Sequence, residues 1–170
     1  MGGEHGLKSI VMKIYKSRAW LLGVAAVLTI AGYYHFFTEE VVVNQVVDGD
    51  TFSATTSDGK TIWVRLKDAD APENTQPFGP ESKHVLAQLV GKKITLRYGL
   101  KRRGHYGRYL ATVVYHNRNI NRMLVRHGYA WAYGSRYKHL QAYARAHRLG
   151  LWGGNNPIPP KMWRKYHPHK

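Results

Sequence analysis

The carboxylates that could bind a metal ion or activate a water molecule form two short clusters. Asp48 and Asp50 flank Gly49, and Glu73 follows Asp70 by three residues in a proline-containing turn. Carboxylate oxygens are hard ligands that suit Ca²⁺ or Mg²⁺, so we expect Asp50 and Asp70 to bind one such ion. Glu73 would then lie beside the ion without having to bind it, where a base that takes a proton from water is needed.

Two arginines lie close to these acids in the predicted elements. Arg65 ends the strand that leads into the loop of Asp70, and Arg108 follows Gly107 at the start of another strand. Two guanidinium groups that converge on a phosphate neutralise its charge and the charge that develops in the transition state. Each feature alone also fits an ordinary turn or a solvated strand residue. The prediction of a site for phosphate chemistry therefore rests on their combination.

The charge of the chain indicates a polyanionic partner. Lys and Arg number 26 against 10 Asp and Glu, which gives a net charge of +16. No acid follows Glu81, so the carboxylates of the body are concentrated within 48–81. Nucleic acid and an anionic membrane surface are the two partners that such a balance favours. The chain has no cysteine, which excludes a disulfide scaffold, a thiolate metal site and a cysteine nucleophile.

An uncharged, largely apolar run over 19–37 follows a basic segment over 1–18. The run would extend about 29 Å as a helix at ~1.5 Å per residue, which is enough to cross a bilayer. Aromatic residues mark both of its ends, and Glu39 and Glu40 follow it. These flanks predict a single-pass membrane anchor with a cytoplasmic N-terminus and an outer or periplasmic body. A cleaved signal peptide, which would release a secreted protein, and a buried core helix are the alternatives.

The rest of the chain predicts strands from β-branched and aromatic segments, and helices from Pro- and Gly-bounded apolar segments. The expected strands cover 40–47, 51–57, 60–66, 92–98 and 108–115, and a loop covers 68–79. The first expected helix begins at Pro80, and two further helices are expected over 120–127 and 136–149. Five strands with about three helices predict an α+β fold, an OB-type barrel over 40–154. The Pro-rich basic segment over 155–170 is predicted to be an irregular tail.

The motifs within 42–152 resemble the staphylococcal nuclease (thermonuclease) family in order and approximate spacing. They are Val46–Phe52, Val64–Leu66, Asp70–Glu73, Phe78–Glu81, Tyr106–Arg108 and Gly150–Trp152. The resemblance implies an OB-fold barrel with three helices that hydrolyses DNA and RNA phosphodiesters with Ca²⁺. It also implies that Asp50, Asp70 and the backbone carbonyl of Ala71 bind the metal.

The resemblance implies roles for the other polar residues too. Glu73 matches the general base, Arg65 and Arg108 match the two phosphate-binding arginines, and Asp48 matches an acid near the metal that does not bind it directly. The loop before Arg108 departs from the family pattern. It lacks the usual aspartate and has His105 where a lysine or arginine is common.

Three residues are expected to contact the substrate. His105 could bind phosphate in a pH-dependent way, although an ordinary loop histidine is the alternative. Tyr106 could stack on bases, which would favour single strands. Tyr133 lies near the position of a further substrate-contacting tyrosine of the family.

The sequence as a whole therefore predicts a monomeric, membrane-anchored or exported Ca²⁺-dependent nuclease that acts on DNA, RNA or both with little sequence preference. Two alternatives belong to other classes. A catalytically silent nucleic-acid-binding module of the same fold would tend to lose some of the five positions Asp50, Arg65, Asp70, Glu73 and Arg108, all of which are present. A polybasic membrane-surface protein would explain the charge but not the cluster of acids.

Overall fold

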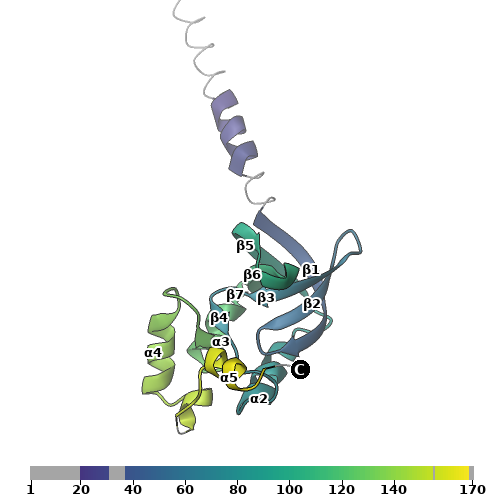
Figure 1. Ribbon diagram of the computed structural model, residues 1–170. Coiled ribbons are helices and arrows are strands. Elements are labelled where there is room, and N and C mark those ends of the chain that lie inside the picture. Colours follow the sequence, from purple (N-terminus) through teal and green to yellow (C-terminus); the bar gives the residue numbers. More distant parts are fainter. Residues whose placement is uncertain (1–19, 31–36, 155, 169–170) are drawn as a thin grey trace, which may run out of the picture. The chain divides into compact units, whose positions relative to one another are not determined.

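The computed structural model describes residues 20–30, 37–154 and 156–168, and it divides into two units, 1–37 and 38–170 (Figure 1). In the first unit, the structure describes a helix over 20–30 and, beyond it, only residue 37. Among the described residues, no helix has both the length and the apolar character needed to cross a membrane. Residues 1–19 and 31–36, which include much of the predicted anchor, lie outside the described part, so the anchor stays a prediction.

The second unit is built on a closed barrel of five strands, as predicted. The strands are β1 (Thr38–Asp48), β2 (Thr51–Thr56), β3 (Thr61–Leu66), β5 (Lys93–Arg103) and β6 (Tyr109–Tyr115). Their order is β3-β2-β1-β5-β6, and a parallel pairing between β3 and β6 closes the barrel (Figure 1). The short β7 (Arg118–Asn119) extends β6 as a hairpin. A second sheet pairs β4 (Ala69–Asp70) with β8 (Trp131–Ala132).

The alternation of side chains explains why these segments form a barrel. In β3, Val64 and Leu66 are buried, whereas Trp63 is exposed and Arg65, between the two buried residues, is half-buried. This period of two places one face of the strand in the barrel core. The connection between the strands expected over 92–98 and 108–115 is shorter than expected, because β5 continues to Arg103. The short helix η1 (His105–Gly107) then leads into β6.

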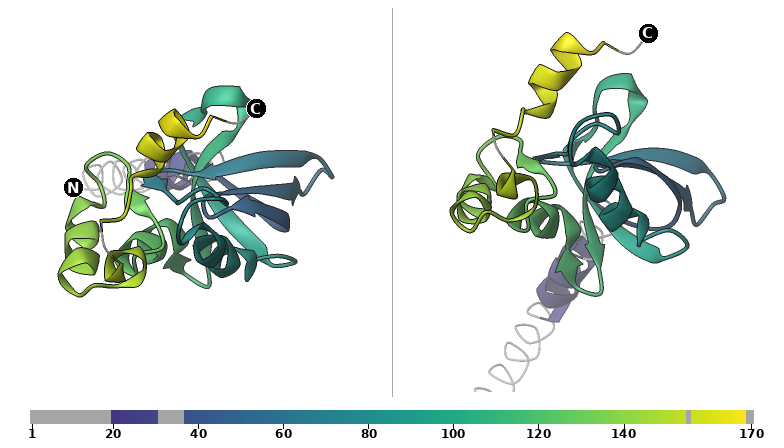
Figure 2. Two further views of the ribbon diagram at one scale, coloured as in Figure 1. Left: turned by 60° about the horizontal axis from the view of Figure 1, so that its bottom comes forward. Right: turned by 90° about the horizontal axis from the view of Figure 1, so that it is seen from below.

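Four α-helices lie in the described part of this unit after β4, one more than predicted. They are α2 (Gly79–Ala87), α3 (Ile120–Arg126), α4 (Lys138–Ala146) and α5 (Pro160–Tyr166), and η2 (Gly150–Gly153) is a short 3₁₀ turn. The prediction of an irregular C-terminal tail was wrong, because α5 forms within it. Pro160 occupies the first turn of α5, where its missing N–H costs nothing, and neither Pro nor Gly follows before the helix ends. Figure 2 shows α5, in yellow, on the outside of the barrel.

A buried amide fixes α3 to the barrel beside the acidic loop. The side chain of Asn121 has no exposed surface, and its Oδ1 accepts a hydrogen bond of 2.9 Å from the N–H of Val113. Its amide nitrogen donates to the carbonyls of Lys67 and Ala111. These three hydrogen bonds join α3 to β6 and to Lys67, which directly follows β3 in the segment that leads to Asp70.

Candidate active site

A tight turn between β1 and β2 places the first carboxylates. Asp48 Oδ1 accepts a hydrogen bond of 2.9 Å from the N–H of Asp50, which fixes the turn. Gly49 allows this turn to pack closely, because a Cβ there would lie 2.7 Å from the Cβ atoms of Ala71 and Ser82. The turn therefore directs Asp50 toward the loop of Asp70 and leaves its carboxylate buried.

The carboxylate of Asp50 is fully engaged. Its Oδ2 accepts a hydrogen bond of 2.9 Å from the N–H of Ala71, and its Oδ1 accepts one of 2.9 Å from the hydroxyl of Thr51. Its Oδ1 also forms an ion pair of 2.9 Å with Nη1 of Arg65. These contacts join β2, β3 and the acidic loop around one buried charge.

Arg65 connects the two predicted metal-binding acids. It is paired in register with Thr51 across β2 and β3, so its side chain lies beside Asp50. Its Nη2 forms an ion pair of 2.6 Å with Asp70 Oδ1, while its Nη1 contacts Asp50. The structure therefore brings Asp50, Arg65 and Asp70 together as the sequence predicted.

Burial dominates the electrostatics of Asp50. Loss of solvent raises the pKa of this carboxyl well above its usual value, against the opposing effect of the Arg65 charge. The neighbouring carboxylates of Asp48 and Asp70 raise the pKa further, and the N–H of Ala71 lowers it. A further positive charge would stabilise the ionised form of Asp50 more strongly here than in water, because the surroundings screen it weakly.

Glu73 lies next to these residues in a loop held by Gln76. Gln76 is buried, and its Oε1 accepts a hydrogen bond of 3.2 Å from the N–H of Glu73. Its own N–H donates to the carbonyl of Glu73 at 2.9 Å, and its side-chain Nε2 donates to the carbonyl of Ile158 at 2.6 Å. Sequence reasoning missed Gln76, whose role depends on contacts that no local motif reveals.

We expect Gly79→Ala to displace Glu73 and to lower both stability and activity. A Cβ at this position would lie 1.8 Å from the carbonyl oxygen of Glu73, so the backbone must move. Crowding of a packed site by an added carbon costs about 1–3 kcal/mol. Chemical denaturation measures the first effect and a cleavage assay the second. Gly154→Ala is the control for both measurements, because Gly154 has a φ of −83° and an added Cβ would meet no atom closer than 3.8 Å.

An arginine from the C-terminal helix completes the cluster, and sequence reasoning missed it. Nη1 of Arg164 lies 2.6 Å from Glu73 Oε1 and 3.2 Å from Asp70 Oδ1. Its Nη2 lies 3.1 Å from Asp70 Oδ2. Partial burial lowers the pKa of this guanidinium, but its hydrogen bonds to Asp70 and Glu73 outweigh that effect and raise it. Arg164 is therefore a permanent positive charge on these acids.

Arg108 differs from Arg65 in having no acidic partner among the described residues. It precedes Tyr109, which pairs with Val64 in the contact that closes the barrel, so it lies beside the strand of Arg65. Its Nε is buried and has no hydrogen-bond partner within the described part of the chain. Its guanidinium carbon lies 5.6 Å from the ring centre of Tyr106. Arg108 is thus able to bind an anionic group.

The remaining predicted site residues are less well connected to the cluster. Tyr106 is 93% exposed beside Arg108, so its ring is open to a partner from solvent. Tyr133 is exposed, and its N–H donates to the carbonyl of Asp68. The side chain of His105 lies outside the described residues. Ala71 contacts Asp50 through its N–H, so the predicted role of its carbonyl stays a prediction.

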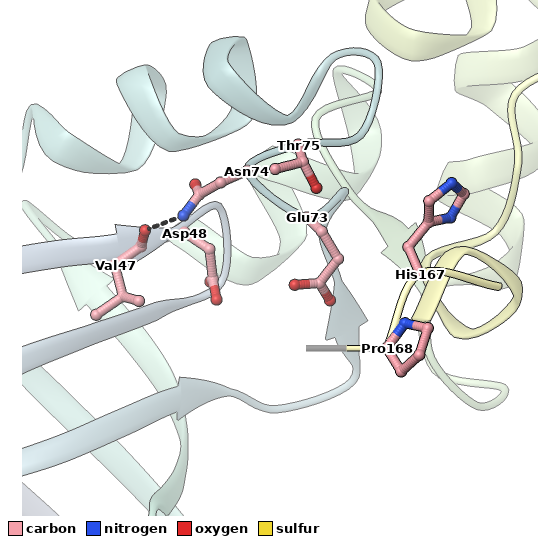
Figure 3. A pocket seen from close by; sticks show the side chains of 7 residues that line it. All are labelled: Val47, Asp48, Glu73, Asn74, Thr75, His167 and Pro168. Carbon is pink, nitrogen blue, oxygen red and sulfur yellow. Dashed lines mark hydrogen bonds between the residues drawn. The ribbon is translucent and has the colours of Figure 1, made fainter. Parts of the chain in front are cut away.

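A pocket of about 420 Å³ opens beside Glu73. Figure 3 shows the carboxylates of Asp48 and Glu73 at this pocket, with His167 and Pro168 from the C-terminal segment across from them. Asn74 helps to shape its wall by donating from its side chain to the carbonyl of Val47 at 2.8 Å. Glu73 thus forms part of the wall of this pocket.

The donor set fits a hard divalent cation in kind. Asp50 and Asp70 present carboxylate oxygens to one another across Arg65, and oxygen ligands are those that Ca²⁺ and Mg²⁺ prefer. No group of three or more His, Cys, Asp or Glu side chains in the described part of the chain is arranged to hold a metal ion. The other ligands would therefore be backbone carbonyls, water or the phosphate of a substrate.

Comparison with protein families gives one match over half of the chain. The model of the family described as staphylococcal nuclease homologue matches residues 63–154. The matched range contains Arg65, Asp70, Glu73 and Arg108. Asp48 and Asp50 precede it, and Arg164 follows it.

Individual relatives extend the similarity beyond that range. An uncharacterized endonuclease of Haemophilus influenzae is 45% identical over 129 residues, which cover 72% of this chain and 71% of the relative. An uncharacterized endonuclease of Escherichia coli O157:H7 is 38% identical over 130 residues, 72% of this chain and 82% of the relative. A protein of Shigella flexneri named micrococcal nuclease is 34% identical over 165 residues, 87% of this chain and 91% of the relative.

Proposed function

Because the chain belongs to the family of staphylococcal nuclease homologues, we propose that it is a Ca²⁺-dependent nuclease that hydrolyses the phosphodiester bonds of DNA, RNA or both. The observation that carries this proposal is a single cluster of charged side chains. In it, Arg65 bridges Asp50 and Asp70, and Arg164 contacts both Asp70 and Glu73. Acids that bind a cation, a base and a guanidinium are the groups that in-line hydrolysis of a phosphodiester requires.

The chemistry of the residues follows from their positions. A divalent cation held by Asp50 and Asp70 would polarise a phosphoryl oxygen and orient a water molecule. Glu73 accepts a proton from the attacking water as the water oxygen bonds to phosphorus. The bond from phosphorus to the sugar 5′-oxygen breaks, and the leaving oxygen takes a proton from solvent water to become a 5′-hydroxyl. Arg108, with its unpartnered Nε, and Arg65 bind the phosphate and offset the charge that develops on it.

Substrate binding is proposed to depend on charge more than on base sequence. The net charge of +16 is carried largely by the part of the chain that follows the acidic clusters. Phosphate contacts carry little sequence information, so affinity should fall with salt and vary little between sequences. The exposed ring of Tyr106 could add base stacking.

Incubation of the full chain with plasmid DNA, and separately with RNA, tests the proposal. We expect both gel-shift binding and cleavage in Ca²⁺, with 5′-hydroxyl ends on the products. Binding of nucleic acid with no cleavage of DNA or of RNA would show instead a catalytically silent module of the same fold.

Asp70→Asn should weaken Ca²⁺ binding by about tenfold or more, a loss at least as large as that seen for groups that only support a metal ligand. The amide keeps the size of the side chain but loses the anionic charge that a hard cation needs. Isothermal titration of Ca²⁺ measures the effect. Asp58→Asn is the matched control, because Asp58 is an exposed acid paired with Lys60 in the turn between β2 and β3. Equal Ca²⁺ affinity in the Asp70 variant and the wild type would refute this assignment.

We also propose that the segment over 19–37 anchors the protein in a membrane, with a cytoplasmic N-terminus and the nuclease unit on the outer or periplasmic side. The uncharged run between a basic segment and Glu39-Glu40 supports this orientation. Extraction tests it: an anchored protein stays with membranes in alkaline carbonate and is released by detergent. Recovery of a shortened chain in the soluble fraction would indicate cleavage and secretion.

A further inference from the structure

Helix α5 covers two of the proposed catalytic carboxylates with a single guanidinium group. Arg164 contacts both oxygens of Asp70, at 3.2 and 3.1 Å, and one oxygen of Glu73, at 2.6 Å. These contacts cross more than 90 residues of sequence. The side chains of Asp70 and Glu73 are 7% and 14% exposed in this arrangement. Little of either carboxylate therefore faces solvent while Arg164 is in place.

Contacts on both sides of Arg164 hold the C-terminal segment against the site. Before it, the carbonyl of Ile158 accepts a hydrogen bond of 2.6 Å from Gln76, and Pro160 is buried. After it, His167 and Pro168 line the pocket that Glu73 also lines (Figure 3). The segment is thus a docked element of the fold.

The position of Arg164 conflicts with that of a metal ion on Asp70. Arg65 and Arg164 share Asp70 Oδ1, and the ion pair of Oδ2 in the described part of the chain is with Arg164. A divalent cation on Asp70 needs one of these oxygens and would lie next to a permanent positive charge. Like charges at such short range repel strongly where solvent is excluded. Binding of the cation therefore favours departure of Arg164 from Asp70.

We propose that α5 is a lid on the active site, and that Arg164 is a tethered counter-cation that the divalent cation and the substrate phosphate must displace. This inference rests on the proposed function, since it assumes that Asp70 binds the metal and Glu73 serves as the base. In the closed state Arg164 neutralises Asp70 and Glu73. In the open state the metal binds the carboxylate of Asp70, and the Arg164 guanidinium is available to bind a phosphate of the substrate.

The contacts of Arg164 are of a kind that can be exchanged. Its side chain is 34% exposed, so water can replace its bonds as they break. A phosphate offers a guanidinium the same paired acceptor oxygens that a carboxylate does. Lys165, its neighbour on the helix, is exposed and makes no contact with the carboxylates in the described structure. The two adjacent positive charges therefore differ in their relation to the site.

Isothermal titration of Ca²⁺ into the full chain tests the lid directly. We expect R164Q to bind Ca²⁺ about tenfold more tightly than the wild type, because one charge-assisted pair no longer has to break first. R164K keeps the charge but loses the paired donors, so it should lie between the two. K165Q is the matched control: it removes the same charge from the same helix and should bind Ca²⁺ as the wild type does.

Unchanged or weaker Ca²⁺ binding by a folded R164Q protein would overturn the inference. Circular dichroism and a thermal melt establish that the variant is folded. If R164Q does not fold, R164K decides the question, and wild-type affinity in R164K would overturn the inference. An equal gain in K165Q would also overturn it, since the effect would then come from net charge alone.

A cleavage assay separates failure of this inference from failure of the proposed function. If the wild type does not cleave nucleic acid in Ca²⁺, the proposed function is wrong and the lid loses its basis. If the wild type cleaves, R164Q should reach half-maximal cleavage at a lower Ca²⁺ concentration. An unchanged Ca²⁺ requirement in R164Q would overturn the lid alone.

Discussion

Replacement of Glu73 by glutamine is expected to lower the rate of nucleic-acid cleavage by about 10²- to 10⁴-fold, the usual contribution of a general acid or base. Glutamine keeps the length of the side chain and can still accept a hydrogen bond from Arg164, which lies 2.6 Å from Glu73 Oε1. It cannot take a proton from the attacking water. Binding of nucleic acid should therefore survive while turnover is lost.

Single-turnover cleavage and a binding isotherm for the same substrate measure these two effects separately. Glu81→Gln is the matched control, because Glu81 is an exposed acid in the first turn of α2. It undergoes the same chemical change outside the carboxylate cluster. Cleavage by the Glu73 variant at the rate of the wild type would show that the base has been assigned wrongly.

Replacement of Arg65 is expected to lower mainly stability, whereas replacement of Arg108 is expected to lower mainly turnover. Arg65→Gln should lower the free energy of unfolding in the absence of metal by about 3 kcal/mol, since it leaves the buried carboxylate of Asp50 without an ion-pair partner in the described structure, while Asp70 keeps Arg164. Asp50 and Asp70 both pair with Arg65, at 2.9 and 2.6 Å. Arg108→Gln breaks no ion pair in the described structure and should change stability by less than about 0.5 kcal/mol. The main effect of Arg108→Gln should be a decrease in turnover of about 10²- to 10³-fold.

Denaturant titration in EGTA and single-turnover cleavage in Ca²⁺ give the two quantities for each variant. Arg118→Gln, which removes an exposed charge from β7, controls for the general loss of positive charge. Equal destabilisation by the Arg65 and Arg108 variants would contradict the different pairing of the two side chains. Wild-type turnover in the Arg108 variant would show that Arg108 has no role in catalysis.

That Asp50, Arg65 and Asp70 lie together could be expected from the sequence, because local chemistry determines the turn and the strand that carry them. A glycine between two aspartates indicates the Asp48–Asp50 turn, and the alternation of apolar and polar residues indicates β3, the strand before Asp70. Strand pairing then brings Thr51 opposite Arg65, so that the two clusters meet. The five-strand barrel was predictable because its strands are β-branched and aromatic segments bounded by turn residues, and β3 adds a period of two.

The features that sequence reasoning missed depend on contacts between distant segments. The composition of the C-terminal segment indicated an irregular tail, yet it contains α5 and places Arg164 on Asp70 and Glu73. Gln76 joins the loop of Glu73 to Ile158, 82 residues later in the chain. No spacing rule links residues that far apart. The absence of any acid in 82–170 was the available signal, because a basic segment without local partners must pair with acids elsewhere or with a polyanion.

Cleavage of plasmid DNA by the full chain, followed in Ca²⁺, after addition of EGTA and after Ca²⁺ is restored, tests the proposed metal-dependent hydrolysis most directly. The two carboxylates joined by Arg65 are expected to need the cation for turnover, so cleavage should stop in EGTA and resume when Ca²⁺ is returned in excess. Cleavage that continues unchanged in EGTA would contradict a role for the metal. DNA and RNA that are both bound but left intact in Ca²⁺ would contradict the activity itself.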